Sequence, residues 1–104
     1  MTKEEVTAWA LAHGWRLRGG FVSLSKPAKP AEPIVRLVFK TTVMSLEFRK
    51  PAGKWEKMGG AAYGAIHPDP DTGVPRGIGL VSIAGLSSLM QENSDRLAFD
   101  GMSR

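Results

Sequence analysis

The chain has 104 residues, a length that suits one domain with a single hydrophobic core. Hydrophobic residues make up 42% of it and charged residues 23%, proportions typical of folded soluble proteins rather than disordered ones. No apolar run is long enough for a transmembrane helix, and the acidic residues near the start are untypical of a signal peptide. Cysteine is absent, which excludes disulfides, thiolate metal sites and a cysteine nucleophile, and we expect a cytoplasmic protein without membrane contact.

The formal net charge is +4, and the positive charge is concentrated in the first half of the chain. Residues 1–57 hold eleven Lys and Arg against five Asp and Glu, whereas residues 58–104 hold three against five. This asymmetry makes an acidic partner, including nucleic acid, worth considering.

A first helix is predicted over residues 3–13. Thr2 and Glu5 have the spacing of a capping box, in which each side chain accepts a hydrogen bond from the backbone N–H of the other residue. Gly14 stands where a residue with a left-handed backbone would end the helix. Between these signals, one stripe at helical spacing is formed by Val6, Trp9, Ala10 and His13.

The segment WRLRGGFVSL, residues 15–24, predicts a β-hairpin with a two-residue turn, because Gly19 and Gly20 permit the positive φ angles of tight hairpin turns. In this register Arg18 faces Phe21, and the strands alternate between two faces. The core face is predicted to carry Trp15, Leu17, Val22 and Leu24. The opposite face is predicted to carry Arg16, Arg18, Phe21 and Ser23.

Residues 25–33 contain prolines at a period of three: Pro27, Pro30 and Pro33. Proline fixes φ and lacks an N–H donor, so this segment is predicted to be a polyproline-like loop and not a strand. A ligand for an SH3-type groove would have the same pattern, but a stiff exposed connector is its commoner use.

A second hairpin is predicted from residues 34–40 and 43–49, with Thr41 and Thr42 at the turn. Thr-Thr is a poor sequence for a tight turn, so a longer loop of the same parity remains open. Arg36 then faces Glu47, and such cross-strand matching stabilises a sheet. The apolar pairs on the core face are Val35–Phe48, Leu37–Leu46 and Phe39–Met44, and the other face adds Ile34–Arg49 and Val38–Ser45.

Downstream, residues 51–54 are predicted to form a turn before a strand near Trp55, and small residues around Tyr63 predict a narrow, closely packed strand. The sequence HPDPDTGVPRG, residues 67–77, is predicted to be a long surface loop. Helical spacing of apolar residues indicates a second helix over residues 81–92, and for the tail a short strand and a frayed end both stay open.

These elements predict a single α+β domain over residues 1–104. It would have an N-terminal helix, an antiparallel sheet of about five strands built from hairpins, and a C-terminal helix.

Catalytic motifs are missing from the sequence, which has no phosphate-loop pattern and no nucleophile elbow. We therefore predict a non-enzyme without cofactor or metal. His67, Asp69 and Asp71 keep a metal-dependent enzyme as a lesser alternative, since oxygen and imidazole ligands bind divalent metals. The prolines between them spread the side chains apart and favour a solvated turn closed by an Asx-type hydrogen bond. For His13, a helix-end role is the default interpretation.

A helix ending in Gly14-Trp15 and followed by a short hairpin resembles the opening of HicA-type RNA-cleaving toxins. The resemblance covers the N-terminal part of the chain and implies a catalytic histidine in the second strand of the hairpin. The corresponding residues, Phe21 to Leu24, contain no histidine, so the resemblance transfers no catalytic residue.

With both hairpins in one sheet, the face opposite the core is the predicted binding surface: Arg16, Arg18, Phe21, Arg36, Lys40 and Arg49. Basic side chains interleaved with an aromatic ring suit phosphate attraction combined with base stacking, and guanidinium groups stack and fork onto phosphate better than amines do. The alternative is an ordinary surface, with an Arg18–Phe21 cation–π contact and an Arg36–Glu47 ion pair. On that interpretation the second helix or another copy of the chain covers the apolar residues Ile34, Val38 and Val43.

We expect a small non-enzymatic binding module that uses this basic sheet face to contact nucleic acid or an acidic protein surface. The first alternative is a protein-binding accessory or inhibitor factor, of the phage or plasmid type, that blocks a larger nucleic-acid-handling machine. The apolar residues on the same face are also compatible with a homodimer.

Overall fold

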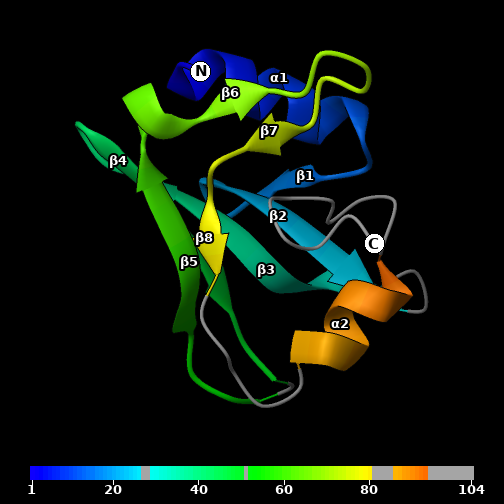
Figure 1. The fold of residues 1–104 in the computed structure, drawn as a ribbon. Coiled ribbons are helices and arrows are strands. Elements are labelled where there is room, and N and C mark those ends of the chain that lie inside the picture. Colours follow the sequence, from blue (N-terminus) through cyan, green and yellow to red (C-terminus); the bar gives the residue numbers. More distant parts are fainter. Residues whose placement is uncertain (27–28, 51, 81–85, 94–104) are drawn as a thin grey trace.

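A six-stranded antiparallel sheet is the centre of the fold, with strand order β1-β2-β3-β4-β5-β8 (Figure 1). The computed structural model describes residues 1–26, 29–50, 52–80 and 86–93. The elements are α1 (Lys3–Ala12), β1 (Arg16–Arg18), β2 (Phe21–Lys26), β3 (Lys29–Phe39), β4 (Val43–Phe48), β5 (Glu56–Ala62), η1 (Tyr63–Ala65), β6 (His67–Pro68), β7 (Pro75–Arg76), β8 (Gly79–Leu80) and α2 (Leu86–Glu92). The predicted α+β class is confirmed, and β8 brings the sheet to six strands instead of about five.

The start of α1 has the predicted capping box. The Thr2 hydroxyl accepts a hydrogen bond from the Glu5 backbone N–H at 3.2 Å, and the Glu5 carboxylate accepts one from the Thr2 backbone N–H at 2.9 Å. Because the bond from the Thr2 backbone N–H favours the charged carboxylate, it lowers the pKa of Glu5. The helix therefore begins where the sequence pattern indicated.

The end of α1 also follows its signal. Gly14 has a φ of 90°, and the Trp15 backbone N–H donates to the Ala10 carbonyl at 3.1 Å, which closes the last turn. His13 caps the helix: its ring stacks on Trp9 with centroids 4.5 Å apart, and Nδ1 lies 2.7 Å from the Trp9 carbonyl oxygen. His13 is exposed and thus has the structural role of a helix-end residue.

Both predicted hairpin registers are confirmed. In the first, Arg16 pairs with Ser23 and Arg18 with Phe21 around a turn whose two glycines have φ angles of 56° and 84°. In the second, Arg36 pairs with Glu47, and the Lys40 N–H donates to the Val43 carbonyl at 2.9 Å across the short Thr41-Thr42 turn. The three predicted core pairs of this hairpin are also present: Val35–Phe48, Leu37–Leu46 and Phe39–Met44.

The prediction of a polyproline loop over residues 25–33 is wrong. β2 continues to Lys26 and β3 begins at Lys29, and Pro33 pairs with Ser25. Register shifts on both sides of Ser25 accommodate residues that cannot follow a regular ladder. This part of β3 also extends beyond the end of β4, so Pro33 does not interrupt a ladder on that side.

One prediction of burial is wrong although the face of the residue is right. Leu17 shares the core parity of Val22, but it is 67% exposed because β1 is a three-residue edge strand and α1 packs on β2 instead. Ile34 lies on the opposite face and is 6% exposed. Its burial agrees with the interpretation in which Ile34 is covered, and Ile34 lines a small cavity together with Arg49 and Lys50.

Residues 67–77 do not form the predicted long loop without regular structure. β6 and β7 make a short hairpin in which His67 pairs with Arg76 and Pro68 with Pro75. The Asp69 N–H donates to the Val74 carbonyl at 2.9 Å and extends the pairing. The sequence did not predict these strands because prolines alternate along the segment, and proline lacks the backbone N–H that a strand donates to its neighbour.

The helices lie at different places along the sheet, as Figure 1 shows: α1 crosses one end beside the β6–β7 hairpin, and α2 lies near the end of β2. Of the predicted second helix, residues 86–92 are helical, and residues 81–85 lie outside the described residues, as does the tail from residue 94 onward.

One hydrophobic core of buried residues joins the elements: Val6, Trp9, Ala10, Trp15, Val22, Leu24, Ile34, Val35, Leu37, Met44, Leu46, Phe48, Met58, Ile66, Val74, Ile78 and Leu89.

The glycines of β5 allow a close approach to β8. A Cβ atom on Gly59 would lie 2.3 Å from the Gly79 carbonyl oxygen. The small residues before Tyr63 thus belong to a closely packed strand, as predicted, but the strand ends at Ala62 and Tyr63 begins the 3-10 helix η1.

We expect Gly59→Ala to lower the free energy of unfolding by about 1–3 kcal/mol, because the added methyl group forces β5 and β8 apart. The matched control is Gly64→Ala, where a Cβ atom meets nothing within 4 Å. Urea unfolding of the two variants and the wild type measures the difference. Equal stability of Gly59→Ala and Gly64→Ala would contradict the close-packing interpretation.

Candidate functional site

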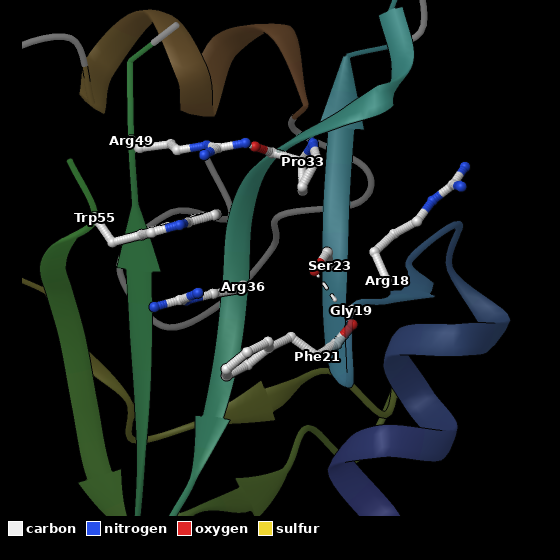
Figure 2. A pocket seen from close by; sticks show the side chains of 8 residues that line it. All are labelled: Arg18, Gly19, Phe21, Ser23, Pro33, Arg36, Arg49 and Trp55. Carbon is white, nitrogen blue, oxygen red and sulfur yellow. Dashed lines mark hydrogen bonds between the residues drawn. The ribbon is translucent and has the colours of Figure 1, made fainter. Parts of the chain in front are cut away.

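A groove of about 250 Å³ lies on the sheet face opposite the core (Figure 2). It is formed by the end of β1 and the turn after it, by β2 and β3, by the residue that follows β4 and by the residue that precedes β5. Its lining residues are Arg18, Gly19, Phe21, Ser23, Pro33, Arg36, Arg49 and Trp55. The structure therefore brings four of the six predicted binding residues, three of them arginines, into one concave site.

Four planar side chains stack along one side of the groove in the order Phe21, Arg36, Trp55 and Arg49 (Figure 2). The Arg36 Cζ atom lies 4.3 Å from the ring centroids of both Phe21 and Trp55, and the Arg49 Cζ atom lies 4.8 Å from that of Trp55. Each such cation–π contact contributes about 0.5–2 kcal/mol, depending on its exposure to water. We call these four side chains the stacked ladder.

In each of the two arginines of the ladder, a hydrogen bond donated by Nε fixes the guanidinium group. Arg36 Nε donates to a Glu47 carboxylate oxygen at 2.7 Å, and Arg49 Nε donates to the Pro33 carbonyl oxygen at 3.1 Å. Within the described residues, the terminal nitrogens of Arg36 and Arg49 have no hydrogen-bond partner. Since guanidinium carries five N–H donors, most of the donors on these two groups are left for a ligand.

The strand registers explain why the ladder forms. Arg36 pairs with Ser23 on β2 and with Glu47 on β4, so its guanidinium reaches Glu47 across the sheet. Phe21 precedes Ser23 by two residues and therefore lies on the same face. Ser23 is buried, and its hydroxyl donates to the Phe21 carbonyl at 3.2 Å, so a small side chain forms the floor between larger ones.

The remaining predicted residues have other positions. Arg18 lines the groove with Gly19 on the side opposite the ladder (Figure 2). Arg16 is exposed on β1, with Nη1 3.5 Å from the Trp15 carbonyl oxygen, and Lys40 is exposed beside the β3–β4 turn. Neither Arg16 nor Lys40 is among the residues that line the groove.

The predicted binding surface did not include four of the groove residues, Gly19, Ser23, Pro33 and Trp55. Among these four, Trp55 is the residue whose ring contacts the arginines. It was recognised only as the beginning of a strand, because the path of the β4–β5 connection is not encoded in strand alternation. A large aromatic residue just after a turn that follows Arg49 was the available signal. Phe21 pairs with Arg18 across the hairpin, as predicted, and Arg36 of the neighbouring strand lies over the Phe21 ring.

The His67, Asp69 and Asp71 segment forms the predicted Asx-type turn. Asp69 Oδ1 accepts hydrogen bonds from the backbone N–H groups of Asp71 and Thr72 at 2.9 and 3.1 Å, and these bonds lower the pKa of Asp69. Arg76 Nε also donates to Asp69 at 3.4 Å. In residues 1–26, 29–50, 52–80 and 86–93, no group of three His, Asp or Glu side chains is arranged to hold a metal ion.

Comparison with protein-family models, with curated proteins and with solved structures finds no match. No helix in the described part of the chain is long and apolar enough to cross a membrane.

We expect Trp55→Ala to make the Arg49 side chain more mobile than the Arg36 side chain. Arg49 would lose its ring contact with Trp55, whereas Arg36 would keep Phe21 and Glu47. Nitrogen-detected NMR of the guanidinium groups should therefore show faster Nε–H exchange for Arg49 than for Arg36.

Arg16, outside the groove, is the internal reference and should not change. Trp55→Phe is the matched control, because phenylalanine keeps a flat face for stacking. Unchanged exchange of Arg49 in Trp55→Ala would show that the tryptophan does not hold it.

Proposed function

We propose that the protein binds nucleic acid through the groove of Arg18, Arg36 and Arg49. The observation that carries this proposal is the convergence of three arginines on one concave site. Guanidinium groups bind phosphate oxygens through charge and through paired N–H donors, and phosphate attraction is the main source of affinity for nucleic acid.

The charges of the groove support an anionic ligand. Arg36 forms an ion pair with Glu47, which offsets part of its charge, and the two side chains are 23% and 25% exposed. Arg49 is held by the Pro33 carbonyl, an uncharged acceptor, and so keeps its full positive charge. The ligand would therefore meet a net positive surface.

The stacked ladder supports binding in a second way. Arginine side chains in water have many rotamers, and ordering them on binding costs free energy. Here Arg36 and Arg49 are already ordered by ring stacking and by Nε hydrogen bonds. Their remaining donors can bind a phosphate with a smaller entropic cost.

We expect the protein to bind a fluorescent single-stranded oligothymidylate most strongly at low salt, because phosphate contacts release counterions. Arg49→Ala should weaken binding and reduce the slope of log affinity against log salt by about one, as the loss of one phosphate contact does. Fluorescence anisotropy across a salt series measures both quantities.

Lys40→Ala is the matched control: it removes the same charge from an exposed side chain outside the groove and should keep the salt slope. No binding at low salt would refute the proposal. Equal effects of Arg49→Ala and Lys40→Ala would refute the assignment of binding to the groove.

A second candidate function is protein recognition at β1, and one observation favours it. Leu17 is 67% exposed on the strand at one edge of the sheet. Edge strands offer backbone N–H and C=O groups to a strand of another chain, and an exposed apolar side chain there adds buried area. This candidate covers the accessory or inhibitor factor expected from the sequence, and also a homodimer.

We expect Leu17→Ser to lose a protein partner that the wild type retains, because the variant removes apolar area from the edge strand. Chemical crosslinking in native cells, followed by mass spectrometry, identifies the partner, and sedimentation of the purified protein tests for a second copy. Leu11→Ser, at an exposed leucine on α1, is the control and should keep the partner. Recovery of the same partner with both variants would exclude the β1 edge as the site that binds the partner.

A further inference from the structure

We infer that the groove recognises the sugar-phosphate backbone of nucleic acid and not its bases. This inference rests on the proposed function and specifies which part of the ligand the site contacts. It departs from the expectation that the aromatic residue on this face serves to stack bases.

Trp55 has no ring face to offer a base. Figure 2 shows Arg36 on one side of the indole and Arg49 on the other, and their Cζ atoms lie 4.3 and 4.8 Å from its centroid. A base could stack there only by displacing a guanidinium group that is also hydrogen-bonded through Nε. Such displacement would sacrifice a cation–π contact to gain a stacking contact of similar strength.

Phe21 is engaged on one face of its ring, where the Arg36 Cζ atom lies 4.3 Å from the centroid, and the residue is half-buried. The aromatic rings of the groove therefore orient arginines. The groups that remain for a ligand are the terminal nitrogens of Arg36 and Arg49, which are donors without an acceptor in the described residues.

The chemistry of these donors selects the backbone. Guanidinium N–H groups pair with phosphate oxygens in fork geometry, and two guanidinium groups held on opposite faces of one indole present two such forks along the groove. A phosphodiester chain carries an acceptor group at every nucleotide, which matches a row of donors better than an isolated anion does.

The size of the groove agrees with a chain passing across it. Its volume of about 250 Å³ is below the roughly 300–1,000 Å³ of pockets that enclose a small molecule. A segment of a polymer needs only to contact the groove, with the bases directed away from it. Trp55 is then a positioning residue for two phosphate-binding arginines.

The test compares two oligomers of equal length and label: single-stranded oligothymidylate, and the same deoxyribose-phosphate chain with abasic residues. We expect wild-type dissociation constants to agree within about threefold, since stacking of even one base contributes about 1–3 kcal/mol, or about fivefold to over a hundredfold in affinity. Fluorescence anisotropy at low salt measures both constants.

The outcomes separate the inference from the proposed function. Binding of oligothymidylate with more than about threefold weaker binding of the abasic chain would overturn the inference and leave nucleic-acid binding intact. Binding of neither oligomer would overturn the proposed function.

Variants at Trp55 give an independent readout. Trp55→Ala should lower the affinity for both oligomers by the same factor, because it loosens the arginines. Trp55→Phe should keep the affinity for both oligomers near that of the wild type. Loss of affinity for oligothymidylate alone would identify Trp55 as a base-stacking residue and contradict the inference. Circular dichroism of each variant verifies that the sheet is intact.

Discussion

The antiparallel pairing of β3 with β2 on one side and β4 on the other is the constraint on which the core and the groove both depend. This register places Val35 and Leu37 in the core and Arg36 between them on the opposite face. A shift of one residue would exchange the two faces and bury the arginine among apolar side chains, where a charge is very costly. The fold and the site are thus maintained by the same backbone hydrogen bonds.

The groove shows how ordinary surface interactions combine into an ordered site. The Arg36–Glu47 ion pair by itself contributes about 0–1 kcal/mol, as surface pairs do. Stacked between Phe21 and Trp55, however, the same guanidinium is fixed from three directions. The aromatic residues thereby convert flexible cations into donors of defined orientation, which favours recognition of a regularly charged chain.

Several parts of this structure could be predicted from the residues alone because the signals are local. The Thr2–Glu5 capping box, the Gly19-Gly20 turn and the alternation of β3 and β4 act over a few residues, and each is present as expected. The proline-rich segments were misjudged for the same reason. Local rules treat proline as a strand breaker, but residues 29–33 pair with β2 alone and their register shifts accommodate the missing donors.

Strand parity in the sequence determined which face each residue occupies, including the common face of Arg18, Phe21, Arg36 and Arg49. Only the tertiary structure decided what covers each face. It left Leu17 exposed, because α1 packs on β2, and it brought Trp55 between two arginines through the connection that follows β4. The physical reason is that alternation follows from the backbone geometry of a single strand, whereas burial and stacking depend on groups distant in the chain.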